Sequence, residues 1–346
     1  MVKAVDRAVE IGANALQIFS DNPTAWRRRA APPAELPAFR ERLRAADIAP
    51  LAIHASYLIN LAGPEDAFYE SSIELLAHEL EAGRVYGARY VNVHIGSHRG
   101  AGLEAGLERL GRGLARVFEE LPRVRTNGGD PDAPEALLVL ENSAGGGGGI
   151  GTTVEELRRI VESAERHGTP VERIRFCLDT AHLWSAGHDL RDEDVLDGLV
   201  RDFDEQIGLD RLALIHLNDS KASLESRLDR HEHIGAGELG AEGMGNVLRH
   251  PLLDPAAFYI ETPGMDEGYD AINMDRVRRL LDGRPLPRLP RGAHLVRGSR
   301  SRRAMPEAPA RPAAPAGPEP TRAKRRVRVR RMLSGAGPAT GSAPED

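Results

Sequence analysis

The sequence of 346 residues contains one cysteine, no long apolar run and no phosphate-binding glycine motif that ends in Gly-Lys-Ser/Thr. The single thiol, Cys177, excludes a framework of disulfides and a cysteine-rich zinc ribbon, and it suits a reducing compartment. No apolar stretch approaches the roughly 20 residues that cross a membrane, and no signal-peptide pattern opens the chain. We therefore expect a cytoplasmic protein without a membrane partner.

The net charge of −6 is distributed unevenly along the chain. Residues 284–346 contain 15 Lys or Arg and four Asp or Glu, a balance of +11, which leaves −17 on residues 1–283. The terminal stretch is rich in Pro, Ala, Arg and Gly and poor in large apolar residues, so it is predicted to be a disordered basic tail. The acidic body argues against a polyanionic partner unless bound metal neutralises its carboxylates.

Residues 1–283 alternate between short apolar runs and longer helical patterns, which predicts parallel βαβ units. Strands are expected at 15–19, 51–55, 90–94, 137–141, 174–179, 212–216 and 258–261. Helices are expected at 2–11, 33–46, 67–86, 102–121, 154–167, 192–207 and 271–281. The pattern favours a (β/α)8 TIM-type barrel that lacks its first strand, because the chain opens on a helix. The alternative, a doubly wound sheet, would place a glycine fingerprint after Phe19, where the sequence reads SDNPTAW.

Most of the predicted strands end on a residue that can bind a metal ion. These residues are His54, His94, Glu141, Asp179, His216 and Glu261. In a barrel the carboxyl ends of the strands meet on one rim, where active sites lie and where unpaired buried polar groups would be costly. Imidazole and carboxylate ligands around a divalent metal remove that cost and suit zinc or manganese. Cys177, two residues before Asp179, is expected to fill the barrel interior on the same side of its strand.

The loop that follows His216 adds further candidate ligands. Asp229 and His231 are two residues apart, so an extended backbone points both to one side, and His182 could join them. With the six strand-end residues this makes nine candidates, which is too many for one ion. We therefore expect two or three ions, as in sites that activate a water and clamp the oxygens of a phosphodiester.

Several long motifs of residues 1–283 resemble those of the endonuclease IV family of apurinic/apyrimidinic endonucleases. They read IGANALQIFSDNPTAW, HASYLINLA, VNVHIGSH, LENSAG, LDTAH, HLNDSK, DRHEHIG and ETPG, and the combination of the fifth, sixth and seventh is highly specific. The resemblance implies a DNA-repair enzyme that hydrolyses the phosphodiester 5′ to an abasic site in duplex DNA. It would leave a 3′-hydroxyl and a 5′-deoxyribose phosphate, and it would act as a monomer associated with the nucleoid.

The resemblance also implies roles for single residues in a trinuclear metal site. The first metal would be held by His54, His94 and the bridging Glu141, the second by Asp179, His216 and Glu261, and the third by His182, Asp229 and His231. Glu261 and Glu141 would be the catalytic carboxylates, with Glu261 supporting the attacking hydroxide. Tyr57 and Leu58 match residues that wedge into the duplex where the sugar is flipped out. The implied ions are zinc, with manganese as an alternative for one of them.

Two other functions are compatible with parts of the pattern. A sugar isomerase or epimerase of the xylose isomerase-like barrel class needs one metal, for which Glu141, Asp179, His216 and Glu261 would suffice. Such an enzyme does not need His54 and the other surplus ligands, which favours the nuclease. The second alternative is a DNA-binding protein that works through its basic tail, and it predicts that removal of residues 284–346 abolishes DNA binding.

Overall fold

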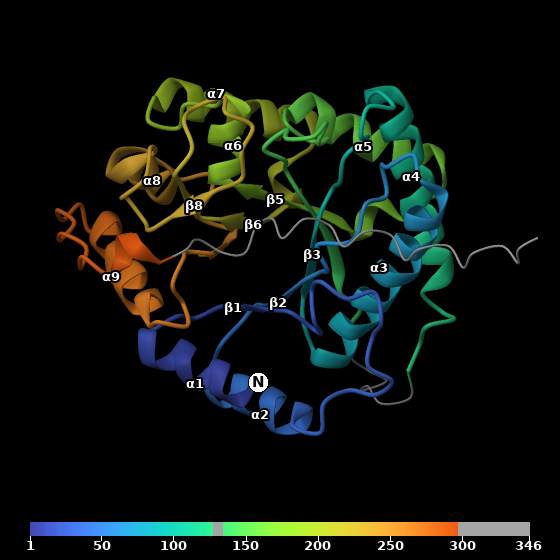
Figure 1. The fold of residues 1–346 in the computed structure, drawn as a ribbon, viewed down its shortest axis with the longest axis horizontal. Helices are drawn as coiled ribbons and strands as arrows, with labels where there is room; N and C mark the ends of the chain where they lie inside the picture. The colour runs from blue at the N-terminus through green and yellow to red at the C-terminus, as the bar shows by residue number, and fades with distance from the viewer. Residues whose placement is uncertain (127–133, 297–346) are drawn as a thin grey trace, which may run out of the picture. The chain divides into compact units, whose positions relative to one another are not determined.

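The computed structural model describes residues 1–126 and 134–296, which form a nearly closed barrel of seven parallel strands surrounded by helices (Figure 1). The barrel strands are β1 (Leu16–Ile18), β2 (Leu51–His54), β3 (Tyr90–His94), β4 (Leu137–Glu141), β5 (Ile174–Asp179), β6 (Leu212–His216) and β9 (Ala257–Tyr259). They are hydrogen-bonded in this order, and every pairing is parallel. The predicted barrel is thus confirmed.

Helices alternate with these strands and cover the outside of the barrel (Figure 1). They are α1 (Val2–Ile11), α2 (Leu36–Ala45), α3 (Asp66–Tyr86), α4 (Leu103–Glu120), α5 (Val154–Arg166), α6 (Thr180–Ala186), α7 (Glu193–Gln206), α8 (Gly240–Arg249) and α9 (Tyr269–Leu281). Short 3-10 turns are η1 (Val171–Arg173), η2 (Leu209–Arg211) and η3 (Ala293–Leu295). Individual residues determine where two of these helices begin or end. The side chain of Thr153 accepts the backbone N–H of Glu156 and so caps the start of α5, and α1 ends at Gly12, which has the left-handed conformation.

Side-chain alternation along the strands separates two apolar layers. On β2, Ile53 packs outward in the large core beneath the helices, whereas Ala52 belongs to a small cluster inside the barrel. The same cluster contains Val139, Cys177 and Leu214, so Cys177 is a buried interior filler as predicted. Because side chains two residues apart share a face, the next inward position on each strand lies at its carboxyl end. The packed interior therefore forms a floor for whatever side chains follow it.

The barrel has one open edge in the part of the chain that the structure describes. There, β1 pairs only with β2, and β9 pairs only with β6. Helices α1 and α9 lie side by side at this edge (Figure 1). Arg7 of α1 donates to both carboxylate oxygens of Asp270 in α9, at 2.5 and 2.8 Å, and Arg278 donates to the carbonyl of Gly12 at 3.0 Å. Side chains from the two helices thus bridge an edge that no described strand closes.

Some elements were not expected from the sequence. Helices α6 and α8 fall in stretches without an assigned pattern, and β7 (Asp219–Ser220) pairs with β8 (His231–Glu232) as an antiparallel hairpin. Composition places residues 284–296 in the tail, but Leu289 and Ala293 are buried and Leu286 packs against the core. The rest of the predicted tail, residues 297–346, lies outside the described residues. Among the described helices, none combines the length and apolarity that crossing a bilayer requires.

The bridge between α1 and α9 leads to a pH-dependent prediction. The hydrogen bond from Arg7 holds the pKa of the Asp270 carboxyl below its ordinary value of 3.8. Ionised Asp270 therefore favours folding above about pH 3.8, and that contribution is lost as the pH falls through the lower pKa of the folded protein. We expect Asp270→Asn to lower the free energy of unfolding at pH 7, with a difference from the unsubstituted chain that shrinks toward pH 2. Urea unfolding across this range measures it.

The matched control is Asp266→Asn, which removes an exposed carboxylate four residues earlier in the chain. It should leave the urea midpoint nearly unchanged. A pH-independent effect of Asp270→Asn would contradict the role assigned to its charge.

Candidate metal centre

The predicted strand-end residues converge at the carboxyl rim of the barrel. His54, His94, Glu141, Asp179 and His216 are the last residues of β2 to β6. In the strand register, His94 lies opposite Glu141, and Asp179 lies opposite His216. Glu261 lies two residues beyond the end of β9, and its side chain still reaches the same group. The barrel thus brings these six side chains together.

Glu141 lies at the centre of this group. Its side chain is fully buried, and its Oε2 is 3.6 Å from Nε2 of both His54 and His94. Its Oε1 is 3.3 Å from Nδ1 of His216 and 3.4 Å from Nδ1 of His182. Two ligand atoms that share one tetrahedral zinc ion at about 2.1 Å lie about 3.4 Å apart. The spacing of Glu141 from His54, His94 and His216 therefore matches that of ligands around common ions.

A second group of possible ligands lies near Oε1 of Glu141. Nδ1 of His216 is 3.4 Å from Oε2 of Glu261 and 3.9 Å from Oδ2 of Asp179. Glu141, Asp179, His216 and Glu261 each offer one ligand atom within 4.8 Å of the others. Glu141 also belongs to a group with His54 and His94, so one carboxylate could serve two ions.

The third predicted set is also brought together. Oδ1 of Asp229 is 3.1 Å from Nε2 of His231 and 3.4 Å from Nε2 of His182. Nε2 of His231 is 3.7 Å from Oδ2 of Asp179, so this set borders the second group. Hairpin β7–β8 places His231, and the turn after β5 places His182 in α6. All nine predicted ligands thus share one site.

Hydrogen bonds fix which ring nitrogen most of these histidines present to the centre. Nδ1 of His54, His182 and His231 lies 2.8 to 3.0 Å from a backbone carbonyl, and Nε2 of His216 lies 3.1 Å from the Gln17 amide oxygen. The N–H on that side leaves a lone pair on the other nitrogen, which faces the carboxylates. Nδ1 of His216, Nε2 of His231 and Oε1 of Glu141 are buried without a hydrogen-bond partner among the described residues. Such orphaned atoms fit bound metal ions.

Amide side chains orient the carboxylates, and sequence reasoning missed them. Asn92 donates to Oε2 of Glu141 at 2.5 Å, and Asn218 donates to Oδ2 of Asp179 at 2.6 Å. Gln17 donates to Oε1 of Glu261 at 2.8 Å, so it contacts both Glu261 and His216. The polar residues Gln17 and Asn92 within apolar strands were a detectable sign of this role.

Electrostatics keep the site charged. Burial opposes ionisation of Glu141, but neighbouring histidines, His216 foremost, lower its pKa well below the ordinary value. Burial likewise opposes protonation of His231, yet the adjacent Asp229 carboxylate and the charges of Asp179 and Glu261 raise the pKa of His231 to about 9. These carboxylates attract cations of any kind, and a metal ion would take the place of the histidine protons. Burial raises the pKa of the Cys177 thiol to about 12, which suits a filler and not a nucleophile.

The two predicted DNA contacts lie on the loop after β2. Tyr57 is 53% exposed, and its ring centroid lies 5.3 Å from that of His54 and 5.9 Å from that of His94. Leu58 is partly buried against the core. Tyr57 therefore stands at the open side of the candidate metal centre.

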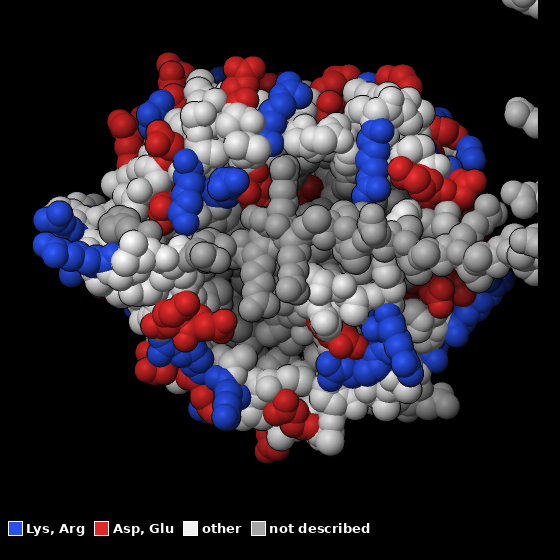
Figure 2. Space-filling view, viewed as in Figure 1, with Lys and Arg blue, Asp and Glu red and all other residues white. Residues whose placement is uncertain are grey.

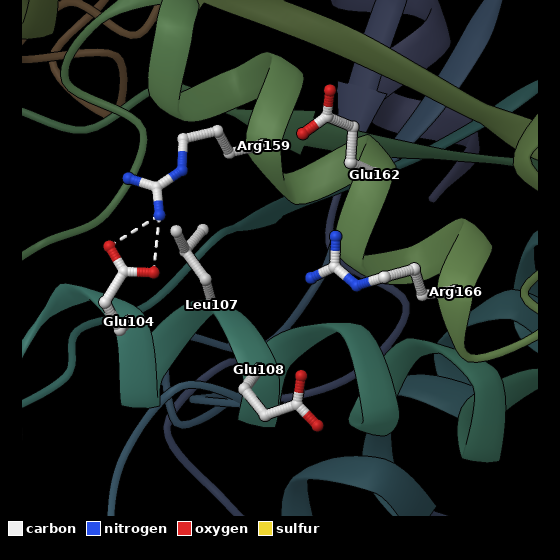
Figure 3. Close-up of a pocket in the computed structure, with 6 residues that line it drawn as sticks. All are labelled: Glu104, Leu107, Glu108, Arg159, Glu162 and Arg166. Carbon is white, nitrogen blue, oxygen red and sulfur yellow. Dashed lines mark hydrogen bonds and ion pairs between the residues drawn. The ribbon is translucent and has the colours of Figure 1, made fainter.

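Lys and Arg side chains lie among Asp and Glu side chains around the margin of the face seen in Figure 2. Lys221, Arg227 and Arg230 are exposed on the loop that carries Asp229. A separate cleft of about 450 Å³ lies on the outside of the barrel between α4 and α5 (Figure 3). Within it, Arg159 donates to both carboxylate oxygens of Glu104, and the cleft contains none of the predicted ligands.

Comparison with known proteins identifies the family. Residues 5–282 match the model of the xylose isomerase-like TIM barrel family. The chain is 42% identical to a probable endonuclease 4 of Halothermothrix orenii, over 80% of this chain and 95% of that protein. It is 40% identical to a probable endonuclease 4 of Methanoculleus marisnigri, over 80% and 94%.

A solved structure agrees with these relatives. Endonuclease IV from Thermus thermophilus superimposes with a TM-score of 0.68 at 37% identity, over 82% of this chain and 94% of that one. A D-tagatose 3-epimerase-like protein superimposes with a TM-score of 0.56 at 16% identity, which shows a shared fold. The chain therefore belongs to the xylose isomerase-like TIM barrel family and, within it, to the endonuclease IV group.

Proposed function

We propose that this protein is a DNA-repair endonuclease that hydrolyses the phosphodiester 5′ to an abasic site, leaving a 3′-hydroxyl and a 5′-deoxyribose phosphate. The relatives named endonuclease 4 support nuclease activity on DNA. The observation that carries the proposal is the set of nine candidate ligands that includes the buried Glu141, and some of their atoms have no hydrogen-bond partner among the described residues. This set exceeds what a single ion requires, and phosphodiester hydrolysis is a reaction that uses several ions.

Two or three divalent ions, zinc with manganese as an alternative at one position, fit the nitrogen and oxygen ligands. His54, His94 and Glu141 would hold the first ion, Glu141, Asp179, His216 and Glu261 the second, and His182, Asp229 and His231 the third. When bound, such ions activate a water and neutralise the charge that develops on the phosphate.

The carboxylates of the site differ in access to solvent, which suggests different roles. The side chains of Glu141 and Asp179 are fully buried, whereas that of Glu261 is 27% exposed. Glu261 can therefore reach a water and a phosphate that approach from the open side, while Glu141 stays beneath as a bridge. Gln17 and Asn218 hold the Glu261 carboxylate and so fix its direction.

Tyr57 and Leu58 would contact DNA beside the centre. A projecting aromatic ring next to buried ligands can enter a duplex where a base is missing, because no base pair has to be broken there. The exposed cations Lys221, Arg227 and Arg230 would contact phosphates. With these contacts the protein would recognise the lesion without reading the sequence of bases.

The alternative is a single-metal sugar isomerase or epimerase. Its support is the four-residue group around His216, together with the fold shared with the D-tagatose 3-epimerase-like protein. Metal content discriminates the two: about one ion per chain favours the isomerase, and two or three favour the nuclease. Incision of a duplex with a single abasic site, tested with and without chelator, is the direct assay. Absence of chelator-sensitive incision by the metal-loaded chain would overturn the nuclease proposal.

We expect Glu261→Gln to lower incision at saturating DNA by at least about 100-fold, as loss of a positioned acid or base does. The amide keeps the size of the side chain, so the metal-free chain should unfold at a nearly unchanged temperature. Single-turnover incision and thermal unfolding measure the two. As a control, the exposed Glu267→Gln on the loop after β9 should be fully active.

Gln17 contacts both His216 and Glu261 and so orients them. We expect Gln17→Ala to weaken metal binding by about 10-fold to 100-fold, because outer hydrogen-bond partners tune ligand geometry. Competition with a chromophoric chelator measures the affinity. Gln206→Ala, at the exposed end of α7, is the matched control and should bind metal normally. Equal affinities of the two variants would show that Gln17 does not support the ligands.

A further inference from the structure

A buried ionic contact lies next to the candidate metal centre but contains none of its ligands. Glu79 on α3 is 2% exposed. Its Oε1 lies 3.4 Å from Nη1 of Arg28, whose side chain is 12% exposed. Burial raises the pKa of the Glu79 carboxyl, while the hydrogen bond from Ser20 and the charge of Arg28 oppose that rise. Burying a charged pair costs free energy of folding. The other contacts of Glu79 and Arg28 therefore indicate the role of the pair.

Both partners hold the loop between β1 and α2, which we call the Ser20–Arg29 loop. Ser20 begins it and donates its hydroxyl to Oε2 of Glu79 at 2.5 Å. Arg28, near its end, donates to the carbonyl of Ala25 at 2.6 Å and to that of Asn22 at 3.4 Å. Arg28 thus binds two backbone carbonyls of the loop. Glu79 contacts Ser20 and Arg28 and so connects both ends of the loop to α3.

The Ser20–Arg29 loop in turn holds the backbone at Tyr57. The carbonyl of Pro23 accepts the backbone N–H of Tyr57 at 3.1 Å and the hydroxyl of Ser56 at 2.7 Å. Tyr57 itself is half-exposed and touches the rings of Phe19, His54 and His94. Its backbone is therefore fixed by the loop, while its ring stays free to meet a partner.

We propose that Glu79 and Arg28 are positioning residues for DNA recognition. Through Ser20 and the carbonyls of the Ser20–Arg29 loop they set the place of Pro23, and Pro23 sets the place of Tyr57 and Leu58 beside the metal centre. This inference rests on the proposed endonuclease function. Neither residue contacts a predicted ligand, so their loss should weaken binding of the lesion and leave metal content and the chemical step intact.

A purely structural role predicts something different. If the pair only stabilised α3, its removal would lower the unfolding temperature without changing the KM for DNA. Glu81, on the same helix, provides the matched comparison, because it is also buried but bonds to Arg84 and Thr126 and not to the loop. Glu81→Gln therefore removes a similar buried charge from α3 without touching the path to Tyr57.

The test compares metal-loaded variants on a duplex with one abasic site. The variants are Glu79→Gln, Arg28→Met, Arg28→Lys, Glu81→Gln and the double variant Glu79→Gln/Arg28→Met. The readouts are KM, kcat, metal content and unfolding temperature. The double variant leaves no unpaired buried charge, so it should unfold at a higher temperature than Arg28→Met alone.

We expect KM to rise between about 10-fold and 100-fold in Arg28→Met and in the double variant, because a misplaced contact residue has effects of this size. The kcat and the metal content should change little. Arg28→Lys keeps the charge but not the forked donor, so its KM should lie between those of Arg28→Met and the unsubstituted chain. Glu81→Gln should lower the unfolding temperature with an unchanged KM.

Two results would overturn the inference while leaving the proposed function in place. One is normal incision with an unchanged KM in both Arg28→Met and the double variant. The other is an equal rise of KM in Glu81→Gln. If the unsubstituted, metal-loaded chain fails to incise the duplex, the proposed function fails, and this inference fails with it.

Discussion

Glu141 is a fully buried carboxylate approached by four histidines, and the rest of the site follows from the need to keep it ionised. An unpaired carboxylate at this depth would be unstable in the folded chain. The surrounding imidazoles compensate the charge, and hydrogen bonds to backbone carbonyls and to Gln17 orient three of the four. Close packing of the small apolar side chains below, such as Ala52 and Val139, excludes water from the floor of the site.

The sequence predicts those parts of this arrangement that depend on residues close together in the chain. Period-two alternation places an inward side chain at the end of each strand, so the sequence alone assigns His54, Glu141 and His216 to one rim. Helix α1 could be bounded correctly for a similar reason, because its apolar period and Gly12 mark its extent. These features depend on neighbours in sequence.

Features that depend on distant residues could not be predicted in the same way. Gln17 and Glu261 are far apart in sequence and come into contact only because the sheet curves into a barrel. Glu79 looks like any acidic residue of an amphipathic helix until the fold places it beside Arg28. Helix α8 begins at Gly240 and contains Gly243 and Gly245, which weaken its local helical pattern, so tertiary packing decides its conformation. Sequence patterns report periodicity, whereas hydrogen-bond partners are a property of the closed fold.

The open edge between β1 and β9 has a consequence for how the chain is held together. Across that edge, Gln17 of β1 donates to Glu261, which follows β9, and also contacts His216 of β6. The same side chains that would surround ions therefore join the two free margins of the sheet. Ions bound there would link the two margins: because they would bind only the assembled rim, their binding free energy would add to the stability of the fold. Barrel closure and catalytic competence would then rise together with the concentration of free metal.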